Sequence, residues 1–199
     1  MLNASIAKSS PVRIPPEWEP QKATWMQWPR FDEKHLRYNF SGIVDALQNY
    51  EPIHILVTNA SARSAAQNFL VNEGVSLMNL TWHIMDYNWC WMRDNGPIWA
   101  VENDELFVQN WKFDGWGEPD TPFAADDAVP PQVAALAGLS CTNYNFFNEK
   151  GNLEFNGAGA LITSWGCLSN RNPGVTMIEM ESLFEKSFGV TQEIGRAHV

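Results

Sequence analysis

The alternation of short apolar runs with amphipathic segments is the feature that most restricts how this chain can fold. Runs typical of strands cover residues 23–28, 53–57, 80–85, 98–101, 106–111, 144–147, 153–155 and 160–163. Segments with apolar side chains at helical spacing cover residues 32–50, 59–70, 131–137 and 177–188. Strands that alternate with helices predict an α/β fold. The pattern alone leaves open whether the elements form a repeat architecture or a plain α/β sandwich.

Local end signals support this division into elements. Asp32 and either Asn59 or Ser61 are expected N-caps of the first two helices, because their side chains can accept hydrogen bonds from free backbone N–H groups. Gly74 is expected to end the second helix. Asn103-Asp104 separates two strand-like runs and predicts a hairpin turn.

The composition is that of one globular domain with an acidic surface. The chain has 199 residues, 45% of them hydrophobic, which is enough to bury a core. Its net charge of -10 argues against a nucleic-acid partner, because phosphate binding requires a basic surface. The negative charge favours a small cationic partner, although acidity also serves solubility alone.

Cysteine content and hydropathy indicate a cytoplasmic protein. Three cysteines at scattered positions give no disulfide framework, which fits a reducing compartment. The first residues lack the apolar segment of a signal peptide, and no run reaches the roughly 18 apolar residues of a membrane span. We therefore expect no membrane association.

Residues 88–99 concentrate the features of a binding site. This stretch holds three tryptophans, an Arg93-Asp94 step and an Asn-Gly-Pro break. A carboxylate beside indole rings suits a flat cation such as guanidinium, which can pair with the carboxylate and stack on an aromatic face. We expect Asp94 where a strand runs out into a turn, facing a cavity. The alternative is that Arg93 and Asp94 neutralise each other at a turn while the tryptophans fill the core.

Four segments, in order along the chain, resemble those of one protein family. They are residues 16–21 with 23–29, Trp91-Met92-Arg93-Asp94-Asn95-Gly96-Pro97, Phe113-Asp114-Gly115-Trp116-Gly117 and Asn170-Arg171-Asn172-Pro173-Gly174. The family is that of agmatine deiminase and bacterial-type peptidylarginine deiminase, and the similarity extends from about Pro16 to Gly189. One such match would be weak, whereas four in the same order are specific.

The resemblance implies the pentein fold, an α/β propeller of five ββαβ-type units around a pseudo-fivefold axis. We expect an incomplete pentein propeller of about three units. In this interpretation residues 1–15 are a loose N-terminal arm, and residues 16–192 are a truncated deiminase catalytic domain. Residues 193–199 are expected to be a non-native tail, because their sequence resembles the translation of a common sequencing adapter.

The resemblance also assigns roles to matched residues. In the family a cysteine thiolate attacks the guanidinium carbon, a histidine handles protons, and carboxylates hold the guanidinium nitrogens. Asp94 matches one of these carboxylates, and Trp91 matches a tryptophan that lines the pocket. Trp116 is expected to be either a pocket wall or a packing residue. Arg93 is expected to orient the chain around it rather than to touch the substrate.

Glu149, Lys150, Gly151 and Asn152 occupy the place of an E-G-G-N/S segment in the family. This match makes Glu149 a second acidic contact and Asn152 part of the turn that presents it. Lys150 replaces a glycine, and a positive φ there would cost about 1 kcal/mol. The alternative is that Glu149 and Lys150 form a solvated pair on a turn.

The sequence contexts of the family's nucleophilic cysteine and acid–base histidine are not recognised in this chain. Cys90, Cys141 and Cys167 lie in other contexts and are not nominated as nucleophiles. His198 lacks the aspartate that follows the family histidine. We therefore expect this part of the protein to be inactive by itself. The resemblance implies neither a cofactor nor a metal ion.

We expect the complete protein to deiminate agmatine to N-carbamoylputrescine and ammonia in polyamine biosynthesis. Peptidylarginine is the second candidate substrate, and the lack of a secretory signal favours the small free amine. Another interpretation is a non-catalytic module, lined by aromatic and acidic residues, that binds guanidinium or quaternary cations. Whether the complete protein forms a homo-oligomer is left open.

Overall fold

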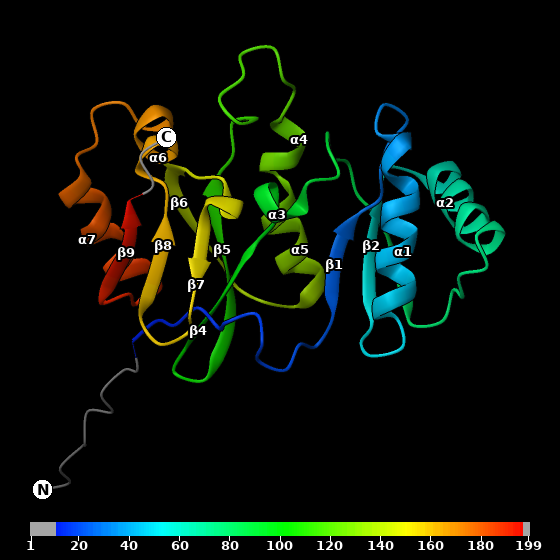
Figure 1. Cartoon of the computed structure of the whole chain (residues 1–199), viewed down its shortest axis with the longest axis horizontal. Coiled ribbons are helices and arrows are strands. Elements are labelled where there is room, and N and C mark those ends of the chain that lie inside the picture. The colour runs from blue at the N-terminus through cyan, green and yellow to red at the C-terminus, as the bar shows by residue number, and fades with distance from the viewer. Residues whose placement is uncertain (1–10, 197–199) are drawn as a thin grey trace, which may run out of the picture.

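The computed structural model describes residues 11–196, in which three three-stranded sheets follow one another along the chain (Figure 1). The expected N-terminal arm is therefore described only from Pro11, and residues 197–199, with His198, lie outside the described part. The first and third sheets occupy the two ends of the molecule, and the second sheet lies between them. Within residues 11–196, every helix is too short or too polar to cross a membrane.

The first sheet is formed by three parallel strands. They are β1 (Thr24–Gln27), β2 (Ile53–Val57) and β3 (Leu80–Ile84), in this order. Parallel neighbours need crossover connections, and these contain η1 (Lys34–Leu36), α1 (Arg37–Leu47) and α2 (Ala60–Asn72). Ile53, Ile55 and Val57 pack with apolar side chains of α1 and α2, whereas Leu56 faces the opposite side of the sheet.

The second and third sheets share one pattern, in which two antiparallel strands are followed by a helical connection and a parallel strand. The second contains β4 (Ile98–Glu102), β5 (Glu105–Lys112), α4 (Ala124–Asp127), α5 (Val129–Ala137) and β6 (Cys141–Phe147). The third contains β7 (Leu153–Phe155), β8 (Ala160–Thr163), α6 (Trp165–Arg171), α7 (Met177–Phe188) and β9 (Gln192–Arg196). The expected α/β class is confirmed. The first sheet departs from the ββαβ pattern, because all of its strands are parallel.

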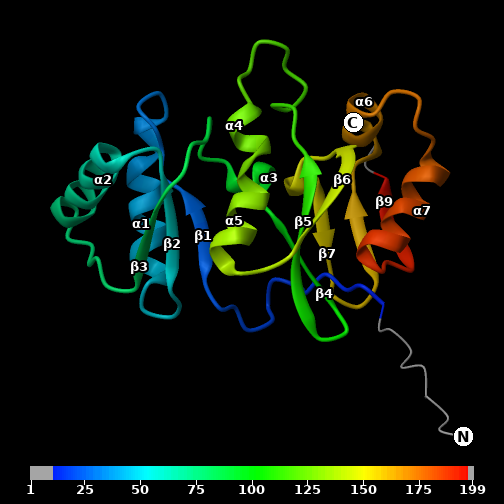
Figure 2. The ribbon, with the colours of Figure 1, turned by 180° about the vertical axis from the view of Figure 1, so that it is seen from behind.

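Two apolar cores join the sheets to one another. Val129 of α5 packs against Leu56 of the first sheet, so that α5 lies between the first and second sheets (Figure 2). Phe184 of α7 packs with Trp111 of the second sheet and Leu161 of the third. The connecting helices α5 and α7 thus also pack against a neighbouring sheet, whereas α1 and α2 pack on the first sheet alone.

The local end signals were correct in three cases and wrong in one. Gly74, with a φ of 77°, follows the end of α2 and donates its N–H to the carbonyl of Val71 over 3.0 Å, as expected. Asn59 accepts a hydrogen bond of 2.8 Å from the backbone N–H of Ala62 and caps α2 as expected. Asn103 and Asp104 adopt φ values of 51° and 64° in the turn between β4 and β5, which confirms the hairpin. Asp32 is not an N-cap, because the chain first forms the 3₁₀ turn η1 and α1 begins only at Arg37.

The described end of the N-terminal segment runs along β4 and the end of α7. Arg13 and Val101 exchange two backbone hydrogen bonds of 2.9 and 2.8 Å. Gly189 ends α7 with a φ of 67°, and a Cβ atom at this position would collide with the backbone of Val12. Gly138 ends α5 with a similar φ of 70° but has no other atom within 4 Å of the place of a Cβ.

Replacing Gly189 with alanine is expected to lower the free energy of unfolding more than replacing Gly138 does. Both variants place a side chain on a left-handed residue, which costs about 1 kcal/mol. Only Gly189→Ala also displaces Val12, and we expect a further loss of roughly 1–3 kcal/mol from this clash. Urea unfolding of the two variants measures the difference. Equal losses would contradict the close packing of the N-terminal segment on α7.

Candidate functional site

Asp94 lies on α3 (Met92–Asn95), a single helical turn that precedes β4. The expected position at the end of a strand is therefore wrong. Strand β3 ends at Ile84, and residues 85–91, called here the anchored loop, separate it from α3. The turn forms because Gly96 donates its backbone N–H to the carbonyl of Met92 over 2.9 Å, which closes α3 before Pro97.

The carboxylate of Asp94 is partly buried and held by two groups from distant segments. The indole Nε1–H of Trp116 donates to its Oδ2 over 3.3 Å, and the backbone N–H of Gly151 also donates to the carboxylate. Burial raises the pKa of the Asp94 carboxyl above its usual range, and the hydrogen bond from Trp116 and the charge of Arg93 offset this only in part. The carboxylate thus faces the segment of Glu149 to Asn152, as the family resemblance implied.

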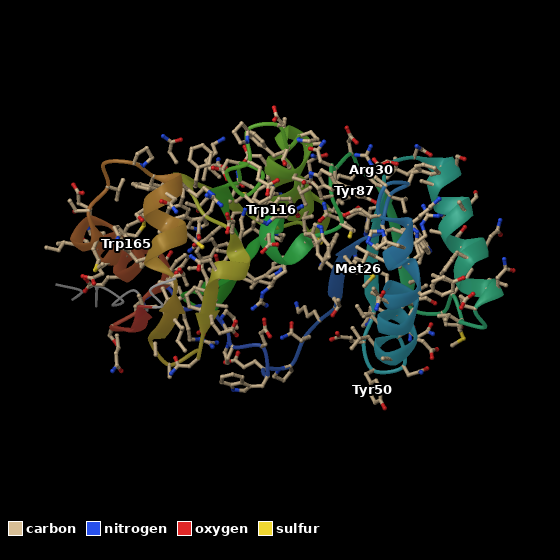
Figure 3. The ribbon with its side chains drawn as sticks, turned by 45° about the horizontal axis from the view of Figure 1, so that its top comes forward. Met26, Arg30, Tyr50, Tyr87, Trp116 and Trp165 are labelled. Atoms are coloured by element: carbon tan, nitrogen blue, oxygen red, sulfur yellow. The ribbon has the colours of Figure 1, made fainter. Side chains whose placement is uncertain are left out.

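Trp116 belongs to the turn of residues 113–117, called here the Trp116 turn. Its φ of 63° and the positive φ values of Gly115 and Gly117 make the chain reverse tightly. The indole packs edge-to-face on Phe113 with ring centroids 5.0 Å apart, while its N–H points to Asp94. Figure 3 shows Trp116 near the middle of the molecule, beside α3. Trp116 is therefore both a packing residue and a direct neighbour of the candidate carboxylate.

Glu149 is paired with a guanidinium group of the protein itself. Arg171 donates from Nη2 to its Oε1 over 2.6 Å and from Nε over 3.0 Å. The same Arg171 Nε lies 3.4 Å from Oδ1 of Asp114. A Cβ atom at Gly117 would collide with Arg171, so the Trp116 turn approaches this pair closely. The alternative of a solvated Glu149–Lys150 pair is wrong, because the partner of Glu149 is Arg171.

Lys150 and Asn152 belong to η2 (Lys150–Asn152), and both point into the protein. Lys150 is buried and donates from Nζ to the carbonyl of Trp111 over 2.9 Å. Burial lowers the pKa of Lys150 to about 8, although the charges of nearby aspartates raise it. Lys150 is not among the residues with positive φ, so replacement of the family glycine causes no backbone strain.

The side chain of Asn152 is used to fix the turn of η2. It donates to Thr163 Oγ1 over 3.1 Å and to the carbonyl of Ser164 over 3.2 Å, and it accepts from the N–H of Ser164 over 3.0 Å. These contacts tie η2 to the end of β8. Asn152 thus lies in the turn after Glu149, and its polar atoms are bonded to the protein, so the structure does not direct it towards a ligand.

Trp91 and Arg93 come just before Asp94 in the chain, and the hydrogen bonds of its carboxylate come from Trp116 and Gly151 instead. Trp91 remains 43% exposed, at the start of α3. Arg93 pairs with Glu17 and, over 2.8 Å, with Glu154. The alternative in which Arg93 and Asp94 neutralise each other is therefore wrong, because each side chain has its main contacts with other residues. Arg93 instead ties α3 to the N-terminal segment and to β7, which fits the expected orienting role.

Buried carboxylates hold the anchored loop, and no sequence motif indicated these carboxylates. Both carboxylate oxygens of Glu33 accept the backbone N–H of Cys90 at 3.1 Å. Arg30 donates to the carbonyl of Tyr87 over 2.5 Å, and Figure 3 shows these two residues close together. Asp126 accepts the backbone N–H groups of Asn88 and Trp89 in the same loop. These contacts are long-range in sequence, so no local pattern predicts them.

The cysteines and paired histidines of the described residues do not form a nucleophilic centre. Cys90 is buried, and burial together with the Glu33 carboxylate raises its pKa, which disfavours a thiolate. His54 Nδ1 and His83 Nε2 lie 2.9 Å apart on β2 and β3, and burial lowers the pKa of both. Within residues 11–196, no group of three or more His, Cys, Asp or Glu side chains is arranged to hold a metal ion.

The protein is an α/β protein in which the partly buried carboxylate of Asp94 lies beside the indole of Trp116. Close to them in the fold, the guanidinium of Arg171 pairs with the carboxylate of Glu149. Residues 13–195 match the sequence profile of the Porphyromonas-type peptidyl-arginine deiminase family. The chain belongs to this family.

Individual relatives agree with the family assignment. The agmatine deiminase of Pseudomonas syringae pv. tomato is 30% identical over 206 residues, which cover 96% of this chain and 54% of that protein. That of Pseudomonas fluorescens is 29% identical, with the same two coverages of 96% and 54%. The chain thus spans about half the length of the curated relatives that it matches.

Solved structures of agmatine deiminases share the fold. The agmatine deiminase of Enterococcus faecalis superposes with a TM-score of 0.82 at 24% identity, over 92% of this chain and 52% of that one. The substrate-bound agmatine deiminase of C. jejuni gives a TM-score of 0.83 at 22% identity, over 97% and 58%. At these identities the similarity establishes the arrangement of sheets and helices in this chain.

Replacing Trp116 with phenylalanine is expected to raise the pKa of the Asp94 carboxyl further. Phenylalanine keeps most of the packing on Phe113 but lacks the N–H group that stabilises the ionised carboxylate. A ¹³C NMR titration of the Asp94 carboxyl measures this pKa. The matched control is Trp89→Phe, since the indole of Trp89 donates to Pro122 instead. An unchanged pKa in Trp116→Phe would show that the indole does not stabilise the carboxylate.

Asp126 is expected to make stability depend on pH. Burial raises its pKa to about 6, from an ordinary value of about 3.9. Its stabilising contribution is therefore complete below the ordinary pKa and is lost as the pH rises through about 6. Asp126→Asn removes this titration. From pH 5 to pH 8 the free energy of unfolding should therefore fall less in this variant than in the wild type. The difference between the two losses should be on the order of 1 kcal/mol. Urea unfolding at both pH values tests this, with exposed Asp120→Asn as the control; identical pH dependence in wild type and Asp126→Asn would contradict it.

Proposed function

We propose that this chain is part of an enzyme that hydrolyses the guanidinium group of agmatine to a ureido group and releases ammonia. Family membership and the names of the relatives support this reaction. The observation that carries the proposal for this chain is the carboxylate of Asp94. It is partly buried, it is oriented by Trp116 and Gly151, and it belongs to the segment by which the family is recognised.

The geometry suits a planar cation. An ionised carboxylate can accept two N–H groups of one guanidinium, and the fixed direction of these bonds orients the planar group. Oriented binding lowers the barrier to attack at the guanidinium carbon by reducing the entropy that must be lost in the reaction. Glu149 already accepts two N–H groups of the Arg171 guanidinium, and Asp114 lies 3.4 Å from Nε of the same group, which supports guanidinium as the chemistry that this part of the protein accommodates.

The remaining catalytic groups are proposed to come from another part of a longer protein. Cys90 is buried beside Glu33, Cys141 begins β6 and Cys167 lies on α6, so these three are poor candidates for the nucleophile. The chain spans about half the length of its relatives, which supports this division. We interpret the three sheets as three units of a five-unit propeller, in which residues 16–192 contribute Asp94, and residues 193–199 remain a predicted non-native tail.

Two of the assigned residues receive modified roles in this proposal. The charge of Glu149 is balanced by Arg171. A substrate or a catalytic histidine that binds Glu149 would therefore contact a carboxylate that Arg171 also contacts. Asn152 shapes η2 and acts on the site through Gly151. Trp91, which is partly exposed, is the aromatic face available for stacking on a ligand bound at Asp94.

Peptidylarginine is the second candidate substrate, because the family profile is named for that activity. The two substrates share the guanidinium group and differ in the atoms that follow it. Comparison of agmatine with N-acetylarginine methylamide therefore separates them. Ammonia release from agmatine alone by the complete gene product would support the small amine, and release from both would favour the peptidyl substrate.

Asp94→Asn is expected to abolish agmatine binding to this chain, because asparagine cannot supply the negative charge for a bidentate guanidinium contact. Isothermal titration calorimetry measures the affinity, with putrescine as the ligand control that lacks the guanidinium group. Affinity should also fall as the pH decreases through the raised pKa of Asp94, since protonation removes the charge. Binding of agmatine and putrescine with equal affinity would overturn the proposed role of Asp94. Agmatine binding by the complete gene product without ammonia release would favour a non-catalytic cation-binding module.

A further inference from the structure

We propose that α4 positions the candidate site, with Asp126 holding the anchored loop and Asp127 holding the Trp116 turn, so that Asp94 and Trp116 meet. Neither aspartate has been placed in the site by the sequence motifs. Both are positioning residues, because each acts on Asp94 through other segments. The consequence for ligand binding rests on the proposed function, whereas the effect on the geometry does not.

Asp126 binds the anchored loop through its backbone. The residue is fully buried, and its Oδ1 accepts the N–H groups of Asn88 at 2.8 Å and Trp89 at 3.3 Å. Gln27 on β1 also donates to this oxygen over 3.5 Å. A buried carboxylate is costly unless N–H groups compensate it, so this contact specifies one position of the loop. Trp91 and α3 follow directly along the chain.

Asn88 returns the contact and makes the connection reciprocal. Its side-chain Oδ1 accepts the backbone N–H of Ala125 at 3.0 Å and that of Asp126 at 3.4 Å. These are N–H groups of the first turn of α4, which lack partners within the helix. Residue Phe123, at the N-cap position, provides no side-chain hydrogen bond. The anchored loop therefore caps α4 while α4 holds the loop, and neither can move without the other.

Asp127 performs the equivalent task for the Trp116 turn. Its Oδ1 accepts the backbone N–H of Phe113 at 2.8 Å, and its Oδ2 lies 3.2 Å from Nζ of Lys112. Phe113 begins the turn and supports the indole of Trp116. Because successive side chains on a helix point about 100° apart, consecutive aspartates can reach two separate segments. A single turn of helix thereby determines the relative position of Asp94 and Trp116.

Asp126 and Asp127 lie near two other charged groups of the region, Glu33 and Lys150. Glu33 lies on the side of the anchored loop and raises the pKa of Asp126, in addition to the effect of burial. Buried Lys150 is the cation common to the group, since the charges of Asp127, Asp94 and Asp126 all act on it. The charges of three carboxylates from two different helices thus all raise the pKa of the same ammonium group, whose Nζ donates to the carbonyl of Trp111.

The test compares alanine and asparagine variants of both aspartates in the full chain. Asparagine retains the oxygen that accepts the backbone N–H groups, whereas alanine removes it. In ¹H–¹⁵N NMR spectra, Asp126→Ala should shift the amide signals of Asn88 and Trp89, and Asp127→Ala that of Phe113. Both alanine variants should also shift the indole N–H signal of Trp116. The exposed Asp120→Ala is the matched control and should shift none of these signals.

Agmatine affinity provides the second measurement. Each alanine variant should bind agmatine about tenfold more weakly, and each asparagine variant should stay within about threefold of the wild type. An indole signal of Trp116 that is unchanged in both folded alanine variants would overturn the proposal. The proposal would also be overturned if the asparagine variants lost as much agmatine affinity as the alanine variants. The oxygen that asparagine retains would then not be what positions the two segments. If the NMR shifts occur but the wild type binds no agmatine, the positioning stands and the proposed function fails.

Discussion

The compensation of buried carboxylates by backbone N–H groups is the interaction on which the candidate site depends. Glu33 and Asp126 are buried and Asp127 is partly buried, and each accepts at least one backbone N–H of a loop outside the sheets. A buried carboxylate without such donors would be strongly destabilising, so the loops are held in one conformation. These hydrogen bonds connect α4 to the anchored loop and to the Trp116 turn, and the turn in turn contacts Asp94.

A second constraint joins the recognised sequence segments into one network. Arg171 pairs with Glu149 and approaches Asp114, and Gly117 leaves room for its guanidinium group. Trp116 next to Gly117 donates to Asp94, and Asp94 in turn lies against Gly151, two residues after Glu149. Segments separated by up to about 80 positions therefore close a ring of contacts. The contacts give a structural reason for the presence of all these segments in one chain, because a change in one segment would displace the others.

The electrostatic balance of this region is compatible with the proposed cationic ligand. Burial raises the pKa of Asp94 and lowers that of Lys150 to about 8, so both groups can change charge more easily than exposed ones. A bound guanidinium would stabilise the ionised form of Asp94. Arg93 does not compete with such a ligand, because Glu17 and Glu154 hold its side chain. Pairing of Arg93 with Glu17 and Glu154 thus leaves the Asp94 carboxylate without an ion pair to that arginine.

The sequence by itself determined the α/β class, most of the strands, the β4–β5 hairpin and the α7 helix, because local periodicity, turn residues and caps act over a few positions. It also located Asp94, Glu149 and Trp116 through a family resemblance. Only the tertiary structure decided that Asp94 lies on a helical turn, that Glu149 is bound by Arg171, and that α4 holds both loops. These features depend on hydrogen bonds between residues far apart in the chain. Such bonds determine the structure only where the groups are buried, and these groups become buried only when the sheets pack together.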